Sequence, residues 1–269
     1  MTSGTATGLD ARTRLHWESA GTGDPVLLIH GLGLSGGAWW RTVDALAPSM
    51  RVITFDHRGI GQSASLTYAY TTEAMADDAV SILDALDIDR LHVYGFSLGG
   101  MVAQQLALRH PERVQSLVLG ATHSGGRRAR IPDSEVMAFF QRRARMPAEE
   151  AAWASVPFNY GPRSQAEQAD RIAEDIERRL ANPFNERAYR AQLLAASLHN
   201  CYGRLERISA PTLVVHGARD RIIPVANAHM SAERVPGAQL TILEDAGHLY
   251  PTEDPSVDKA IGAFFAAHG

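Results

Sequence analysis

The chain has 269 residues, of which 45% are hydrophobic and 21% are charged. These values are ordinary for a globular protein, and a chain of this length buries roughly three quarters of its unfolded surface, so its core needs no disulfide. Cys201 is the only cysteine, which excludes an internal disulfide and a cysteine metal cluster. The formal net charge of −4 argues against nucleic acid as the main partner.

Residues 1–25 contain no apolar run of the length that a signal peptide needs. No later stretch approaches the ~20 apolar residues of a membrane span, and a lone thiol is compatible with a reducing compartment. We therefore expect a cytoplasmic protein that acts on a small-molecule substrate, with no nucleic-acid or membrane partner, as a monomer or small homo-oligomer.

The first part of the chain alternates apolar runs with helical patterns. Residues 1–10 are expected to be a disordered lead, and 13–18 an edge strand. Continuous apolar runs, typical of strands buried on both faces of a parallel sheet, follow at 26–29, 51–55, 91–94 and 114–119. Apolar residues recur at helical spacing at 71–86 and 101–108. This alternation predicts right-handed βαβ units and a parallel sheet.

The alternation stops at residue 122. From 123 to about 207 no strand pattern occurs, and helical patterns separated by prolines cover 134–145, 148–154, 165–180 and 185–198. Strands and helices then alternate again at 211–215, 225–234, 239–243 and 256–267. We predict a core made of residues 1–122 and 208–269, with 123–207 as an all-helical cap over the carboxyl edge of the sheet, where such folds bind ligands.

A glycine-flanked serine lies between the strand at 91–94 and the helix that follows it. The sequence Gly95-Phe96-Ser97-Leu98-Gly99 has the form G-x-S-x-G. A turn sharp enough to lift the serine above the sheet strains its backbone, and side chains at the flanking positions would clash with the strand and helix. Such a turn leaves the N–H of Leu98 at a helix start, where unpaired donors and the helix dipole favour negative charge. It would supply a nucleophile and one oxyanion donor.

Two later strand ends carry an acid and an imidazole. Asp220 follows the strand at 211–215, and His248 follows the strand at 239–243. The serine hydroxyl needs a base to attack at neutral pH, and histidine, with an ordinary pKa near ~6.5, can accept that proton and return it. A carboxylate fixes the imidazole tautomer. The order Ser97, Asp220, His248 therefore predicts a catalytic triad.

The loop after the strand at 26–29, His-Gly-Leu-Gly at 30–33, is expected to supply the second oxyanion donor through the backbone N–H of Leu32. Losing one such donor typically costs about 10²- to 10³-fold in rate. Candidates for the substrate pocket, although the aromatic ones also suit a core, are Gly31, His123, Trp39, Phe139 and Trp153.

These motifs resemble those of the α/β-hydrolases nearly from end to end. The shared segments are HGLG at 30–33, DHRGIGQS at 56–63, GFSLGG at 95–100, HGARD at 216–220 and AGH at 246–248. Residues 95–119 are especially similar to the 3-oxoadipate enol-lactonase-like esterases and lactonases. The resemblance implies an eight-stranded, mostly parallel sheet, a lid domain, and a Ser-His-Asp triad that works without cofactor or metal. A serine at position 97 argues against haloalkane dehalogenase and epoxide hydrolase chemistry, whose relatives carry aspartate there.

We therefore expect a serine hydrolase that cleaves an ester or lactone of a small, fairly apolar molecule through an acyl-enzyme. Thioesterases, C–C bond hydrolases and cofactor-free perhydrolases share these motifs, so perhydrolysis or C–C bond hydrolysis on the same triad is the alternative reaction. A ligand-binding protein on a hydrolase fold is the alternative of another class. Turnover separates this last hypothesis from the others.

Overall fold

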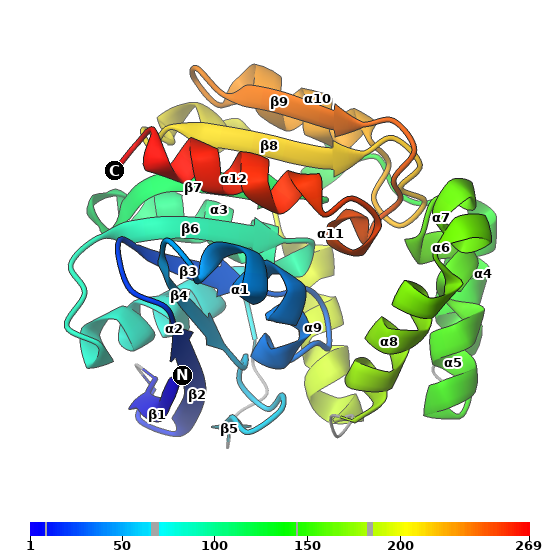
Figure 1. Cartoon of the computed structure of the whole chain (residues 1–269), viewed down its shortest axis with the longest axis horizontal. Helices are drawn as coiled ribbons and strands as arrows, with labels where there is room; N and C mark the ends of the chain where they lie inside the picture. The colour runs from blue at the N-terminus through cyan, green and yellow to red at the C-terminus, as the bar shows by residue number, and fades with distance from the viewer. Residues whose placement is uncertain (9, 66–69, 144, 182–184) are drawn as a thin grey trace.

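The computed structural model describes residues 1–8, 10–65, 70–143, 145–181 and 185–269. Its strands form one sheet in the order β1-β2-β4-β3-β6-β7-β8-β9 (Figure 1). The strands are β1 Thr2–Thr7, β2 Thr13–Ala20, β3 Pro25–Ile29, β4 Arg51–Phe55, β6 Leu91–Phe96, β7 Val114–Gly120, β8 Thr212–Gly217 and β9 Gln239–Leu243, and the two-residue β5 Ala64–Ser65 pairs with β2. Strands β4, β3, β6, β7, β8 and β9 pair in parallel. The predicted eight-stranded, mostly parallel sheet is confirmed.

The N-terminal segment differs from the sequence prediction. Thr2–Thr7 is not a disordered lead but forms β1, which pairs antiparallel with β2 and sets Ala6 opposite Leu15. Strand β2 is therefore an interior strand, because it also pairs with β4. The segment is rich in threonine, glycine and serine, and Ala6 is the one residue of β1 that is buried. Its pairing with β2, which local sequence does not reveal, gives the segment its structure.

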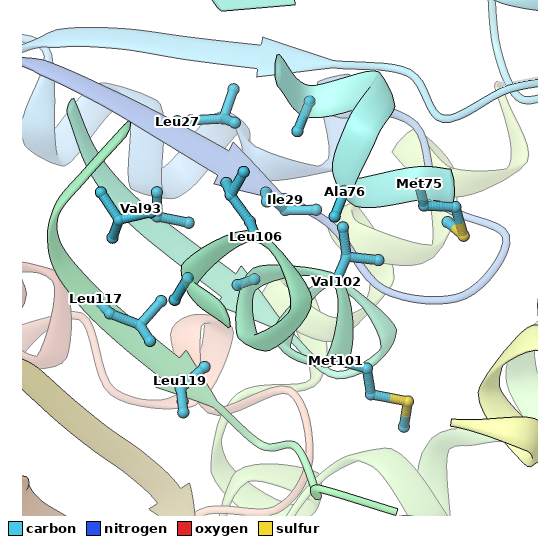
Figure 2. Close-up of a cluster of buried hydrophobic side chains, with 14 of the residues drawn as sticks. Leu27, Ile29, Met75, Ala76, Val93, Met101, Val102, Leu106, Leu117 and Leu119 are labelled. Atoms are coloured by element: carbon cyan, nitrogen blue, oxygen red, sulfur yellow. The ribbon is translucent and has the colours of Figure 1, made fainter. Parts of the chain in front are cut away.

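Helices cover both faces of the sheet. They are η1 Gly36–Trp39, α1 Trp40–Leu46, α2 Thr72–Ala85, α3 Leu98–Arg109, η2 Pro111–Arg113, α10 Ala226–Arg234, α11 Tyr250–Glu253 and α12 Ser256–Ala266. Alternate residues of each buried strand enter two separate hydrophobic clusters, so that Leu27 belongs to one and Leu28 to the other. Figure 2 shows Leu106 of α3 beside Ile29 of β3, and Val102 of α3 beside Ala76 of α2, in the first cluster. This packing fixes α3 and the turn that precedes it.

Between β7 and β8 the described residues form helices and one isolated bridge, Gly125 to Asn200. The helices are η3 Gly126–Arg128, α4 Ser134–Arg143, α5 Ala148–Ala154, α6 Val156–Asn159, α7 Pro162–Glu167, α8 Ala169–Leu180, α9 Glu186–Leu198 and η4 Tyr202–Arg207. Figure 1 shows α4 to α9 beyond the carboxyl ends of the parallel strands. We refer to residues 123–207 as the cap, and their independence as a domain stays a prediction.

Two predicted cap helices have different limits in the structure. The pattern at 165–180 is divided at Gln168, whose side-chain amide donates a 3.0 Å hydrogen bond to the carbonyl of Glu253. The pattern at 134–145 ends as a helix at Arg143, and residue 144 lies outside the described residues. In the described part of the chain, no helix is both long and apolar enough to cross a membrane.

Candidate active site

The turn between β6 and α3 holds Ser97 in a strained conformation, with φ 56° and ψ −119°. Two hydrogen bonds fix it: its N–H donates to the carbonyl of Gly120 at 2.8 Å, and its carbonyl accepts from the Thr122 hydroxyl at 2.7 Å. A Cβ atom at Gly99 would lie 1.9 Å from the carbonyl oxygen of Ile29, so only glycine fits there. The predicted sharp turn is present, and it sets Ser97 at the carboxyl end of β6.

The structure brings Ser97, His248 and Asp220 together from three strand ends. His248 Nε2 lies 3.1 Å from Ser97 Oγ, and His248 Nδ1 lies 2.7 Å from Asp220 Oδ2. The other carboxylate oxygen, Oδ1, accepts from the backbone N–H groups of Ile222 and Ile223, each at 2.8 Å. An ionised carboxylate only accepts, so Nδ1 carries the proton and Nε2 is left to accept one from the serine.

A second imidazole supports the acid. The Asp220 side chain is fully buried, and burial alone would raise its pKa. The His248 charge and the hydrogen bonds of His216 and His248 outweigh burial and lower the pKa of Asp220 to about 2. Sequence reasoning missed His216, although it stands four residues before Asp220 in the HGARD segment at the end of β8. The signal available in the sequence was a histidine only four residues before the predicted acid, at the end of the same strand.

Glu253 of α11 fixes the loop that carries His248. Its Oε1 accepts from the N–H of Gly247 at 2.7 Å, and its Oε2 accepts from the N–H of Gly161 at 2.8 Å. One carboxylate thus joins the histidine loop to the cap. The sequence carries no signal for this role, because Glu253 looks like any acidic residue near a helix end.

The two candidate oxyanion donors come from the expected segments. Leu98 is the first residue of α3, and Leu32 lies in the loop after β3. This loop lies against the serine turn, since a Cβ atom at Gly31 would be 3.1 Å from Ser97 Cβ. The part that these two N–H groups play in catalysis stays a prediction.

A pocket lies between the η1–α1 segment, α8 and α11, and neither Ser97 nor His248 is among the residues that line it. Phe96 lines it, and the Phe96 ring centroid is 5.2 Å from that of His248. Of the predicted pocket residues, Trp39 lines this pocket and is 3% exposed.

Of the other predicted pocket residues, Gly31 lies against Ser97, and three do not line this pocket. Phe139 packs on Phe158, with ring centroids 4.8 Å apart, in a cluster within the cap. Trp153 is 47% exposed and does not line the pocket. His123 accepts at Nδ1 from the N–H of Gly125, and burial lowers its pKa to about 4.

Neither cofactor nor metal is part of the expected mechanism. Within the residues that the structure describes, no group of three or more His, Cys, Asp or Glu side chains is arranged to hold a metal ion.

Burial, with smaller contributions from His57 and His248, lowers the pKa of His30 to about 3. The imidazole beside the oxyanion loop is therefore neutral at neutral pH.

A family model described as the alpha/beta hydrolase fold matches residues 24–255. The chain belongs to the α/β-hydrolase fold family. Its resemblance to that family, inferred from the strand-end motifs, is thereby confirmed.

Individual relatives agree with this assignment. A protein named "Putative carbamate hydrolase RutD" from Caulobacter sp. (strain K31) is 34% identical over 266 residues, which cover 97% of this chain and 96% of the relative. A thermophilic esterase from Thermogutta terrifontis is 29% identical, with a TM-score of 0.84 and full coverage of both chains. The enol-lactonase from Burkholderia xenovorans LB400 has a TM-score of 0.84 over 98% of this chain and 100% of its own, and at 24% identity this likeness shows the fold alone. Together, these comparisons support the prediction that this chain is a hydrolase.

Proposed function

We propose that this α/β-hydrolase is a serine hydrolase that cleaves an ester or lactone of a small, fairly apolar molecule. The observation that carries the proposal is the continuous contact from Asp220 Oδ2 through both nitrogens of His248 to Ser97 Oγ, at 2.7 and 3.1 Å. Both distances lie within hydrogen-bond reach, about 2.6–3.2 Å, so the base can take the serine proton and the carboxylate can orient the base.

In the proposed reaction, Ser97 Oγ attacks the carbonyl carbon while His248 Nε2 takes the hydroxyl proton. The carbonyl oxygen becomes negatively charged and accepts hydrogen bonds from the N–H groups of Leu32 and Leu98, the latter at the positive end of α3. The intermediate then collapses, the bond to the leaving oxygen breaks, and His248 gives its proton to that oxygen. In a lactone the leaving oxygen stays on the acyl chain, so ring opening leaves one molecule bound to the serine.

Hydrolysis of the acyl-enzyme uses the same groups. His248 takes a proton from water, the hydroxide formed attacks the ester carbonyl, and the proton returns to Ser97 Oγ as the acid leaves. Asp220 holds the imidazole in one tautomer and stabilises the imidazolium in both halves of the cycle. Its low pKa keeps it ionised throughout the neutral range.

Carbamate hydrolysis is the second candidate, because a relative that covers nearly the whole chain is named for it. A carbamate carbonyl offers the same attack and the same oxyanion. Perhydrolysis with peroxide and C–C bond hydrolysis also use such a triad, and a protein that binds its ligand without turnover would keep the geometry alone.

A substrate panel tests the proposal. It contains short-chain nitrophenyl esters, five- and six-membered lactones, a thioester, nitrophenyl carbamates and a dienoic ketone, each with wild type and Ser97→Ala, and the esters also with peroxide. We expect ester or lactone turnover by wild type that is lost in Ser97→Ala. Turnover confined to carbamates, to peroxide or to the ketone would replace the proposed reaction, and binding without any turnover would replace the enzyme by a ligand-binding protein.

A further inference from the structure

A helix of the cap holds the loop that carries Leu32. The backbone N–H of Gly33 donates a 2.8 Å hydrogen bond to Oε1 of Gln192 in α9. The two residues are 159 positions apart in the chain, and Gln192 is completely buried. The hydrogen bond is partly buried, and the cap supplies the acceptor for the Gly33 N–H.

A second residue of α9 packs on the same glycine. A Cβ atom at Gly33 would lie 2.7 Å from Cδ2 of the Tyr189 ring, and the φ of Gly33 is +72°. Residues three positions apart share one face of a helix, so Tyr189 and Gln192 reach Gly33 together. The ring limits where the glycine can lie, and the amide limits how its N–H is turned.

Helix α9 is itself fixed to the core, on the loop after β4. The side-chain amide of Asn185 donates to the carbonyl of Gly59 at 2.9 Å, and its oxygen caps α9 by accepting from the N–H of Ala188 at 3.1 Å. Ala188 is fully buried and packs with Ile60. A helix held in this way gives Gln192 a fixed position relative to the sheet.

Gly33 matters because it shares a peptide unit with Leu32. The Gln192 oxygen fixes the plane of that unit. The preceding unit, which joins Gly31 to Leu32, is held because its carbonyl accepts from the N–H of Leu34 at 3.3 Å. Leu32 thus lies between two fixed peptide groups. An oxyanion donor works only when it lies about 2.7–3.1 Å from the charged oxygen, so a small rotation of this loop would reduce its effect.

We propose that Gln192 is a positioning residue, which directs the Leu32 N–H into the oxyanion hole. The geometry of the oxyanion hole then depends on the position of cap helix α9. The inference rests on the proposed function, because the oxyanion forms only in attack by Ser97. Gln192 acts through Gly33 and needs no contact with substrate.

Three variants test it. Gln192→Met keeps most of the side-chain length and removes the acceptor, whereas Gln192→Glu keeps an oxygen at the same reach. Gln115→Met is the matched control: the Gln115 side-chain amide also donates to a backbone carbonyl, that of His268 at 2.9 Å, and Gln115 lies near the amino end of β7, at the sheet edge opposite the Leu32 loop. For each we would measure kcat and KM on nitrophenyl butyrate, Ki for a trifluoromethyl ketone, which forms a tetrahedral oxyanion adduct, and the melting temperature.

We expect Gln192→Met to lower kcat about tenfold or more, with KM within about twofold of wild type, because the lost interaction acts in the transition state. Ki for the ketone should rise by about the factor by which kcat/KM falls. Gln192→Glu should recover most of both losses, and Gln115→Met should match wild type. A melting temperature lowered without these kinetic changes would mean that Gln192 is only structural.

If Gln192→Met does not fold, Gln192→Ala replaces it in the test, because the smaller alanine side chain admits water to the Gly33 N–H. An unchanged kcat in a folded variant, a lower kcat with unchanged ketone affinity, or no recovery in Gln192→Glu would overturn the inference. If wild type neither hydrolyses the ester nor binds the ketone, the proposed function is wrong and the inference falls with it. If wild type is active and Gln192→Met has the same kcat, the inference alone is wrong.

Discussion

His216 Nε2 lies 3.1 Å from Asp220 Oδ2, the same oxygen that lies 2.7 Å from His248 Nδ1. His216 Nε2 also lies 2.8 Å from the carbonyl oxygen of Ile223, which can only accept, so this nitrogen carries the proton. His216 is fully buried, and its Nδ1 has no partner among the described residues. The His216 N–H therefore lies against both the Ile223 carbonyl and the carboxylate oxygen that contacts the base.

Replacing this imidazole should weaken the acid without removing it. In His216→Phe, Asp220 loses one donor while keeping His248 and two backbone N–H groups, so the pKa of Asp220 should rise. We expect kcat/KM on an ester to fall about ten- to a hundredfold, in line with the loss of one hydrogen bond to a charged group, about 1.5–3 kcal/mol. His216→Gln, which can still donate, should be closer to wild type, and equal activities of the two variants would contradict this role.

The acid itself should be essential for rate and unimportant for substrate binding. Asp220→Asn replaces an acceptor with a group that can donate, which favours the wrong tautomer of His248, and in a well-studied triad this costs about 10⁴-fold in kcat. Steady-state kinetics should show that fall with KM little changed. A variant with full activity would mean that another carboxylate orients His248.

A buried carboxyl outside the Ser97–His248–Asp220 triad should make stability depend on pH. Burial raises the pKa of Asp258 in α12 to about 6, against the opposing hydrogen bond from the Thr42 hydroxyl of α1 at 3.1 Å. The folded state therefore holds a proton that the unfolded chain, with a carboxyl pKa near 3.8, releases earlier. This contribution to stability is complete below about pH 4 and is lost as the pH rises through about 6.

Asp258→Asn should remove that loss, since an amide stays neutral and can still accept from Thr42. The shift of about two pKa units corresponds to roughly 3 kcal/mol, so we expect the variant to be more stable than wild type by about 1–3 kcal/mol at pH 8 and nearly equal at pH 4. Urea unfolding at the two pH values measures the difference. A stability difference that is the same at both would refute the assignment.

The serine turn should tolerate no side chain at Gly99. A Cβ atom there would lie 1.9 Å from the carbonyl oxygen of Ile29 and 2.7 Å from that of His30. Both obstacles are backbone atoms of the strand end beside the turn, so Gly99→Ala should force β3 and α3 apart and cost about 3 kcal/mol or more. Circular dichroism melts against Gly203→Ala, where a Cβ atom meets nothing within 4 Å, measure it. Equal melting temperatures would argue against this packing.

The active-site geometry was predictable because each of its chemical groups follows a strand of the parallel sheet. Apolar runs located the parallel strands, and the carboxyl ends of such strands share one edge, so Ser97, Asp220 and His248 had to lie near one another. The helical cap was predicted from the absence of strand patterns between 123 and 207. These inferences used local patterns and one general rule of sheet topology.

The missed features depend on contacts between distant segments. Gln192 and Glu253 act on the loops at Gly33 and Gly247, and nothing near either residue in the sequence records that contact. Strand β1 forms by pairing with β2, and Gln168, which separates α7 from α8, donates its side-chain amide to the carbonyl of Glu253. Trp153 follows a helical pattern that suits a pocket wall, yet the packing of the cap leaves it half exposed.

The most direct test of the account is the intact mass of wild type and Ser97→Ala after exposure to a fluorophosphonate, with release of nitrophenol from short-chain esters followed in parallel. His248, 3.1 Å from Ser97 Oγ, should activate that hydroxyl toward the reagent. The account predicts one adduct on wild type, none on Ser97→Ala, and ester turnover by wild type alone. An adduct on Ser97→Ala, or a wild type that takes no adduct and releases no nitrophenol, would contradict it.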